Sequence, residues 1–186
     1  MSLQPYEQAV ASTRSVLAQA TAERMSDPTP CASWTVADLI NHVIGGQHFF
    51  AAGMNGTPPS ADHPEFVKGD FVAAFDEAAA AALAAFAADG ALGKMVKMPF
   101  GEMPGMVVLG LATTDTFVHG WDLAKALGLS TDLNPELATA LLAQSEKSIS
   151  DGFRGPDGKA PFGAKQSADN AATAADKLAA FLGRTI

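Results

Sequence analysis

The chain has 186 residues, a size typical of one domain with one hydrophobic core, so we expect residues 1–186 to form a single domain. Hydrophobic residues make up 48% of the sequence and charged residues 17%, a composition that excludes an intrinsically disordered protein. The formal net charge of -8 provides no basic field that could gather nucleic acid or an anionic membrane, so neither is an expected partner.

The same sequence favours the cytoplasm. Its longest run of small apolar residues, at positions 78–88, is mostly alanine and much shorter than the about 20 strongly apolar residues of a membrane-spanning helix. The first basic side chain is Arg14, so the charged start of a secretory signal is missing. The single cysteine, Cys31, agrees with a reducing compartment. We therefore expect a cytoplasmic protein.

Apolar residues at helical spacing predict three helices in the first half of the chain, and alanine, the strongest helix former, is the commonest residue. Two prolines within residues 26–30 end the first helix, and Ser33 or Thr35 caps the second. Residues 53–69 are rich in glycine, proline and aspartate and predict a loop. The three helices are expected over residues 5–24, 36–50 and 71–86.

The second half of the chain predicts three more helices. Residues 94–105 indicate an extended piece and an irregular turn before the longest helical pattern, which Gly128 closes. Asn134 caps the next helix. Residues 150–170 form an irregular C-terminal arm. The helices are expected over residues 106–127, 135–149 and 171–182, and the fold class is all-α.

Three ionisable residues of the helix over residues 106–127 lie within its apolar stripe. With Asp115 at zero and about 100° per residue, His119 falls at about 40° and Asp122 at about 340°, among the side chains that face the core. An isolated carboxylate in a low dielectric needs a partner or shifts its pKa by several units. A bound cation would supply that partner.

Asp115 and His119 are four residues apart, the spacing at which two side chains meet on one helix face. His42 lies at the border of the apolar stripe of the second helix, and Gly46, one turn later, leaves room for a ligand. Imidazole nitrogens with a carboxylate oxygen are donors of catalytic zinc sites, which keep an open position. His42, Asp115 and His119 are therefore candidate ligands of a divalent metal ion.

Other interpretations of these residues stay open. Asp115 and His119 can form a buried hydrogen-bonded pair without a metal, and His42 can be structural. Asp122 can orient a ligand histidine, which we favour, compete as a ligand, or be a buried acid bonded to the backbone or solvent. Four further residues have ordinary interpretations: surface positions for His48 and His63, packing for Trp121 and an inert thiol for Cys31.

Three segments carry a family resemblance: Trp34-x-x-x-Asp38-Leu39-x-x-His42, Pro99-Phe100-Gly101-Glu102-Met103-Pro104-Gly105 and Asp115-x-x-x-His119-Gly120-Trp121-Asp122-Leu123-Ala124. They resemble the metal-binding family around mycothiol-dependent maleylpyruvate isomerase, within the wider DinB-like and YfiT-like group. The His-Gly-Trp-Asp-Leu-Ala string is fairly specific, whereas the similar ending Ala179-Ala180-Phe181-Leu182-Gly183-Arg184 is weak by itself.

This resemblance implies a four-helix bundle in up-down-down-up order with additional short helices, and a divalent metal between the helices, most often zinc, with nickel as an alternative. The implied ligands are His42, Asp115 and His119, with Asp122 orienting the site. The isomerase has glutamate at the position of Asp115, so the shorter side chain either draws the metal closer to the helix or needs a water to complete the link. A homodimer is a further expectation.

The function expected from this resemblance is the activation of a low-molecular-weight thiol, mycothiol or a similar one, for transfer to or isomerisation of an electrophilic small molecule. A cation deprotonates a coordinated sulfur and so produces a nucleophile at neutral pH. Glu102 and Arg154 are candidate contacts to the thiol or the substrate. Two alternatives are a non-catalytic, stress-related metal-binding module and a helical scaffold without metal.

Overall fold

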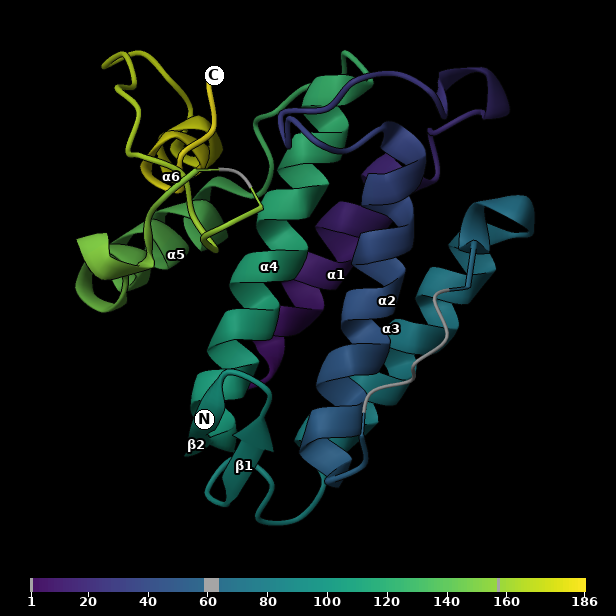
Figure 1. Cartoon of the computed structure of the whole chain (residues 1–186), viewed down its shortest axis with the longest axis vertical. Coiled ribbons are helices and arrows are strands. Elements are labelled where there is room, and N and C mark those ends of the chain that lie inside the picture. The colour runs from purple at the N-terminus through teal and green to yellow at the C-terminus, as the bar shows by residue number, and fades with distance from the viewer. Residues whose placement is uncertain (1, 59–63, 157) are drawn as a thin grey trace.

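Four helices lie alongside one another and form the body of the molecule in the computed structural model (Figure 1). α2 packs mainly against α3, α1 packs mainly against α4, and α2 also contacts α4. These helices are α1 (Gln4–Leu17), α2 (Val36–Asn55), α3 (Phe71–Ala87) and α4 (Gly105–Ala126). The interface between α2 and α4 brings the candidate ligands of the two helices to one place.

The remaining elements flank this body. The strands β1 (Met95–Met98) and β2 (Gly101–Pro104) form an antiparallel hairpin that precedes α4. The helices α5 (Pro135–Ser148) and α6 (Ala174–Phe181) pack against each other beside α4 (Figure 1). Short 3-10 turns are η1 (Ala22–Arg24), η2 (Phe66–Lys68) and η3 (Asp151–Phe153).

The structure describes residues 2–58, 64–156 and 158–186. Within these ranges, none of the helices combines the length and the hydropathy that crossing a membrane would require. His63, expected at the surface, lies outside the described residues.

The prediction of a mostly helical chain is confirmed, and its purely all-α form is corrected by the hairpin. Within residues 94–105 the predicted extended piece consists of the two paired strands. In β1, Val96 and Met98 are buried and alternate with exposed neighbours, which is typical of a half-buried strand. Gly101, at φ 141°, provides the backbone conformation needed at the turn.

Helix boundaries follow local capping and the end of the buried stripe. The first helix ends at Leu17 rather than near residue 24, because Leu17 is its last buried side chain. Thr35, one of the two expected caps, accepts a hydrogen bond from the Asp38 backbone N–H, and the Asp38 carboxylate accepts one from the Thr35 backbone N–H. Thr173 caps α6 in the same way, so α6 begins later than residue 171.

Close contact between α1 and α4 depends on Gly120. A methyl group at Gly120 would stand 2.3 Å from Thr13 Oγ1 and 3.2 Å from Thr13 Cα. Gly120→Ala is therefore expected to lower the free energy of unfolding by about 1–3 kcal/mol through overpacking. Gly45→Ala is the matched control, because no atom of the described residues lies within 4 Å of a methyl group there and α2 gains up to about 1 kcal/mol of helix propensity. Urea unfolding of both variants measures the contrast, and equal stabilities would contradict this packing.

Candidate metal centre

The three candidate ligands come together between α2 and α4. Asp115 Oδ1 lies 3.5 Å from His119 Nε2, one turn along α4, and 3.9 Å from His42 Nε2 on α2. One ligand atom from each residue lies within 4.8 Å of the other two. Two zinc ligands at 2.0–2.2 Å from the ion stand roughly 3.3 Å apart in a tetrahedron. Small side-chain adjustments would therefore close this set around one ion.

His42 provides a direct test of whether the residues fit a metal. Its Nε2 atom is buried and has no hydrogen-bond partner among the residues that the structure describes. Leaving a buried polar atom unpaired costs about 1–3 kcal/mol. This nitrogen lies beside the Asp115 carboxylate, so two nitrogens and one oxygen face a common point. The donor set fits a divalent cation of the zinc type.

Trp34 covers both imidazoles from one side. Its ring centroid lies 4.5 Å from that of His42 and 5.6 Å from that of His119. The two imidazoles stand at 78° to each other with centroids 4.7 Å apart. A half-buried indole at this position restricts solvent access on one side of the centre and limits the rotation of both rings.

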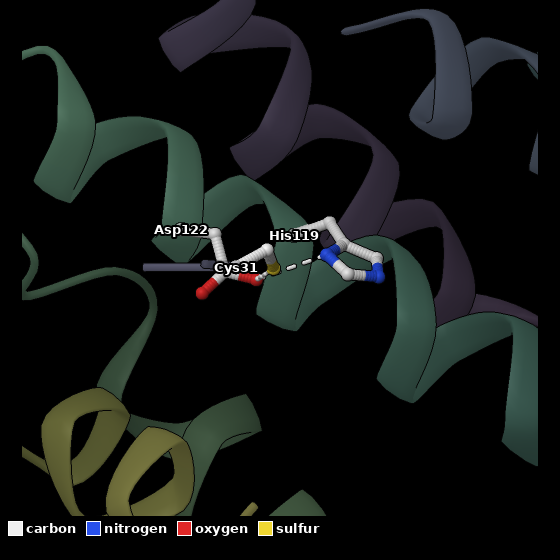
Figure 2. Close-up of side chains that lie close together, drawn as sticks. All are labelled: Cys31, His119 and Asp122. Atoms are coloured by element: carbon white, nitrogen blue, oxygen red, sulfur yellow. Dashed lines mark hydrogen bonds and ion pairs between the residues drawn. The ribbon is translucent and has the colours of Figure 1, made fainter. Parts of the chain in front are cut away.

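A second group of potential donors shares His119 (Figure 2). Cys31, His119 and Asp122 each place one such atom within 4.8 Å of the others. Asp122 is fully buried, and its Oδ2 lies 2.9 Å from His119 Nδ1 and 3.3 Å from Cys31 Sγ. Because an ionised carboxylate only accepts hydrogen bonds, His119 Nδ1–H donates to Asp122, and the other ring nitrogen faces Asp115 and His42.

Arg184 already provides the cation for this second group. Its Nη2 donates to Asp122 Oδ2 at 2.9 Å and its Nε to Asp122 Oδ1 at 3.2 Å. The guanidinium thus compensates the buried carboxylate, and its Nη2 lies 3.9 Å from Cys31 Sγ. Charge compensation therefore favours the His42 group over the Cys31 group as the place for a metal ion.

Ionisation of the three acidic and basic groups on α4 follows from these contacts. Burial alone would raise the pKa of Asp115, but the two imidazoles hold that pKa well below its usual range. Burial opposes the charging of His119, and the carboxylates of Asp115 and Asp122 outweigh it and raise the His119 pKa. Burial also raises the pKa of Asp122, but Arg184 and His119 lower it to about 2. Both carboxylates are ionised at neutral pH, the state in which they can ligate a metal.

Two residues expected to contact thiol or substrate are not part of either donor group. Glu102 lies exposed on β2, opposite Lys97 in the hairpin. Arg154 lies in the C-terminal arm, where its Nη1 donates to the backbone carbonyls of Gly163 and Phe181. The Arg154 guanidinium also lies over the Phe181 ring. These contacts tie the arm to the end of α6.

The structure clarifies two other residues. His48 is exposed on α2 and stacks on Phe66, as expected of a surface histidine. Trp121 is buried and its indole Nε1 donates to Asp176 Oδ1 at 2.9 Å, which confirms its predicted packing role.

Three residues in or beside the site have no predicted role there. Trp34 belongs to one of the motifs of the family resemblance, Cys31 is predicted to be an inert thiol, and Arg184 belongs to the weakly similar ending of the chain. A signal for Arg184 existed, because a buried Asp122 carboxylate needs hydrogen-bond donors or a compensating charge, and a basic side chain from elsewhere in the chain can supply both.

Comparison with known proteins defines the family of this chain. Residues 6–124 match the family model described as the mycothiol maleylpyruvate isomerase N-terminal domain. The chain belongs to this family.

Two relatives come from Mycobacterium tuberculosis: the uncharacterized protein Rv0738 of strain ATCC 25618 / H37Rv and the uncharacterized protein MT0763 of strain CDC 1551 / Oshkosh. Each is 43% identical to the chain over 187 residues, an alignment that covers 99% of this chain and 98% of the relative. The similarity therefore extends beyond the family domain into α5, the arm and α6.

Solved structures of mycothiol-dependent maleylpyruvate isomerase share the fold. A histidine-to-alanine mutant of that enzyme aligns with a TM-score of 0.62 at 17% identity, and another crystal structure of the isomerase aligns with 0.59 at 18%. Both alignments cover 76% of this chain and 66% of the isomerase chain. The match therefore spans slightly less than two thirds of the isomerase, and at this identity it shows the fold alone.

Proposed function

We propose that this protein binds a divalent metal ion through His42, Asp115 and His119. The combination of two imidazole nitrogens and one carboxylate oxygen favours zinc as that ion. The observation that carries the proposal is the convergence of two imidazole nitrogens and one carboxylate oxygen from two helices, with His42 Nε2 buried and unpaired among the described residues. The family to which the chain belongs is named for a mycothiol-dependent enzyme. We infer that the centre serves a low-molecular-weight thiol, mycothiol or a close relative.

The proposal assigns a task to each residue. Asp115 and the two histidines hold the ion, and Asp122 orients His119 by accepting its Nδ1–H. Trp34 shields one side of the two rings. If these residues hold a divalent cation, the pKa of a thiol bound to it would be lowered, so that the sulfur would be a thiolate at neutral pH. The reaction class is thiol transfer to, or thiol-assisted isomerisation of, an electrophilic small molecule.

The same proposal includes the finer points of architecture and location. We place α1 to α4 in a DinB-like four-helix bundle of up-down-down-up order, within one domain over residues 1–186. We also propose that the protein is a homodimer and that it lies in the cytoplasm. Analytical ultracentrifugation tests the dimer, and a single concentration-independent monomer would remove that part alone.

Thiol binding at the metal is tested with protein in which Co²⁺ replaces the native ion. Titration with mycothiol is expected to produce a near-ultraviolet sulfur-to-cobalt charge-transfer band, because the thiolate joins the metal. The S-methyl derivative of the same thiol is the matched control and should give no band. Protein that binds Co²⁺ but shows no band with mycothiol, cysteine or coenzyme A would favour the non-catalytic metal-binding module.

A further inference from the structure

We propose that Arg184, in the C-terminal tail, is a positioning residue of the metal centre: it fixes the Asp122 carboxylate, which in turn orients the His119 ring toward Asp115 and His42. This inference rests on the proposed metal centre and goes beyond its ligand set. It makes the tail after α6 a structural part of the site, although Arg184 follows Asp122 by 62 positions.

Arg184 and Asp122 form a buried, bidentate ion pair. Two guanidinium nitrogens donate to the two oxygens of Asp122, at 2.9 and 3.2 Å. The Asp122 side chain is 0% exposed and that of Arg184 is 12% exposed. A planar guanidinium that binds both carboxylate oxygens fixes the rotation of the carboxylate as well as its charge.

The backbone holds Arg184 in place for this contact. Its N–H donates to the Ala179 carbonyl of α6, and its Nη1 donates to the Leu182 carbonyl. Helix α6 is itself tied to α4 by the hydrogen bond from Trp121 to Asp176. Consecutive residues of α4, Trp121 and Asp122, therefore anchor α6 and the tail that follows it.

The effect on His119 follows from the shared oxygen. Asp122 Oδ2 accepts from both Arg184 Nη2 and His119 Nδ1, each at 2.9 Å. If Arg184 is removed, the carboxylate loses the contact that fixes its plane, and the ring it holds can rotate. Outer contacts of this kind commonly change metal affinity by 10–100-fold.

The test measures zinc affinity by competition with a chromogenic chelator in full-length protein. Arg184→Gln is expected to weaken zinc binding about 10–100-fold. The zinc affinity of Arg184→Lys is expected to lie between those of Arg184→Gln and the wild type, because lysine restores the positive charge but cannot bind both carboxylate oxygens as the planar guanidinium does. The d–d spectrum of the Co²⁺ form should change in Arg184→Gln, since a displaced ring alters the ligand field. Unchanged affinity in Arg184→Gln would overturn the inference.

A double-mutant cycle separates action through Asp122 from independent action. Asp122→Asn alone should weaken zinc binding to a similar degree, and Asp122→Asn with Arg184→Gln should bind within about twofold of Asp122→Asn alone. The double variant buries no uncompensated charge, so it keeps the test decisive even where Arg184→Gln fails to fold. Losses that multiply in the double variant would overturn the inference.

Arg24→Gln is the matched control. Arg24 Nη2 donates to the Ala126 carbonyl at the end of α4 and does not contact Asp122. This variant should lose stability but keep its zinc affinity within about twofold. An equal loss of affinity in Arg24→Gln and Arg184→Gln would overturn the inference, because the effect would then be general. Wild-type protein that binds no zinc at all would instead overturn the proposed function.

Discussion

Replacing His119 with alanine is expected to reduce the zinc content from about one ion per chain to a trace. His119 provides one of the three donors and is the only residue that belongs to both donor groups among the described residues. Its removal leaves two donors, which is fewer than the three or four protein ligands of zinc sites. Elemental analysis of the purified proteins measures the change.

The same variant should lose its stabilisation by zinc. Free zinc at 100 times its dissociation constant raises the free energy of unfolding by about 2.7 kcal/mol, and His119→Ala should show almost none of this gain. His48→Ala is the control, because His48 is exposed on α2 and stacks on Phe66 away from the donor groups. Equal metal content in wild type and His119→Ala would contradict the proposed centre.

Replacing Trp121 with alanine is expected to lower the free energy of unfolding by about 3–5 kcal/mol. Trp121 is 1% exposed and packs in a cluster with Leu137, Leu141 and Leu178 that joins α4 to α5 and α6. The substitution leaves a cavity there and removes the hydrogen bond to Asp176. Urea unfolding followed by far-ultraviolet circular dichroism measures the loss.

Val107→Ala is the control for this prediction. Val107 lies on the same helix but is 44% exposed, so its truncation should change stability by no more than about 0.5 kcal/mol. Comparable losses in the two variants would show that Trp121 does not connect α4 to the C-terminal helices as the packing indicates.

The helices could be predicted from the sequence because their apolar residues repeat at a helical period. The stripe on α4 also showed that Asp115, His119 and Asp122 face inward. Residues 94–105 predict an extended piece but not its pairing, because each strand has only four residues, Pro99 lies in the turn and Pro104 ends β2, so a period of two is hard to recognise. The end of α1 was misplaced because small residues after Leu17 still fit a helical pattern.

The tail could not be placed from the sequence. Arg154 and Arg184 both follow α5, and neither belongs to a periodic segment that fixes its direction. In the structure, Arg154 donates to a carbonyl at the end of α6, whereas Arg184 donates to Asp122. The packing of α6 against α4 determines which arginine reaches Asp122. Long-range pairing of a buried charge depends on tertiary packing, which single-sequence patterns do not contain.

The most direct test of the metal centre is anomalous X-ray scattering at the zinc edge from crystals of the native protein. The proposal predicts one anomalous peak per chain within coordination distance of His42 Nε2, His119 Nε2 and Asp115. A peak beside Cys31 and Asp122, or crystals of zinc-supplemented protein that show no peak at these three residues, would contradict it.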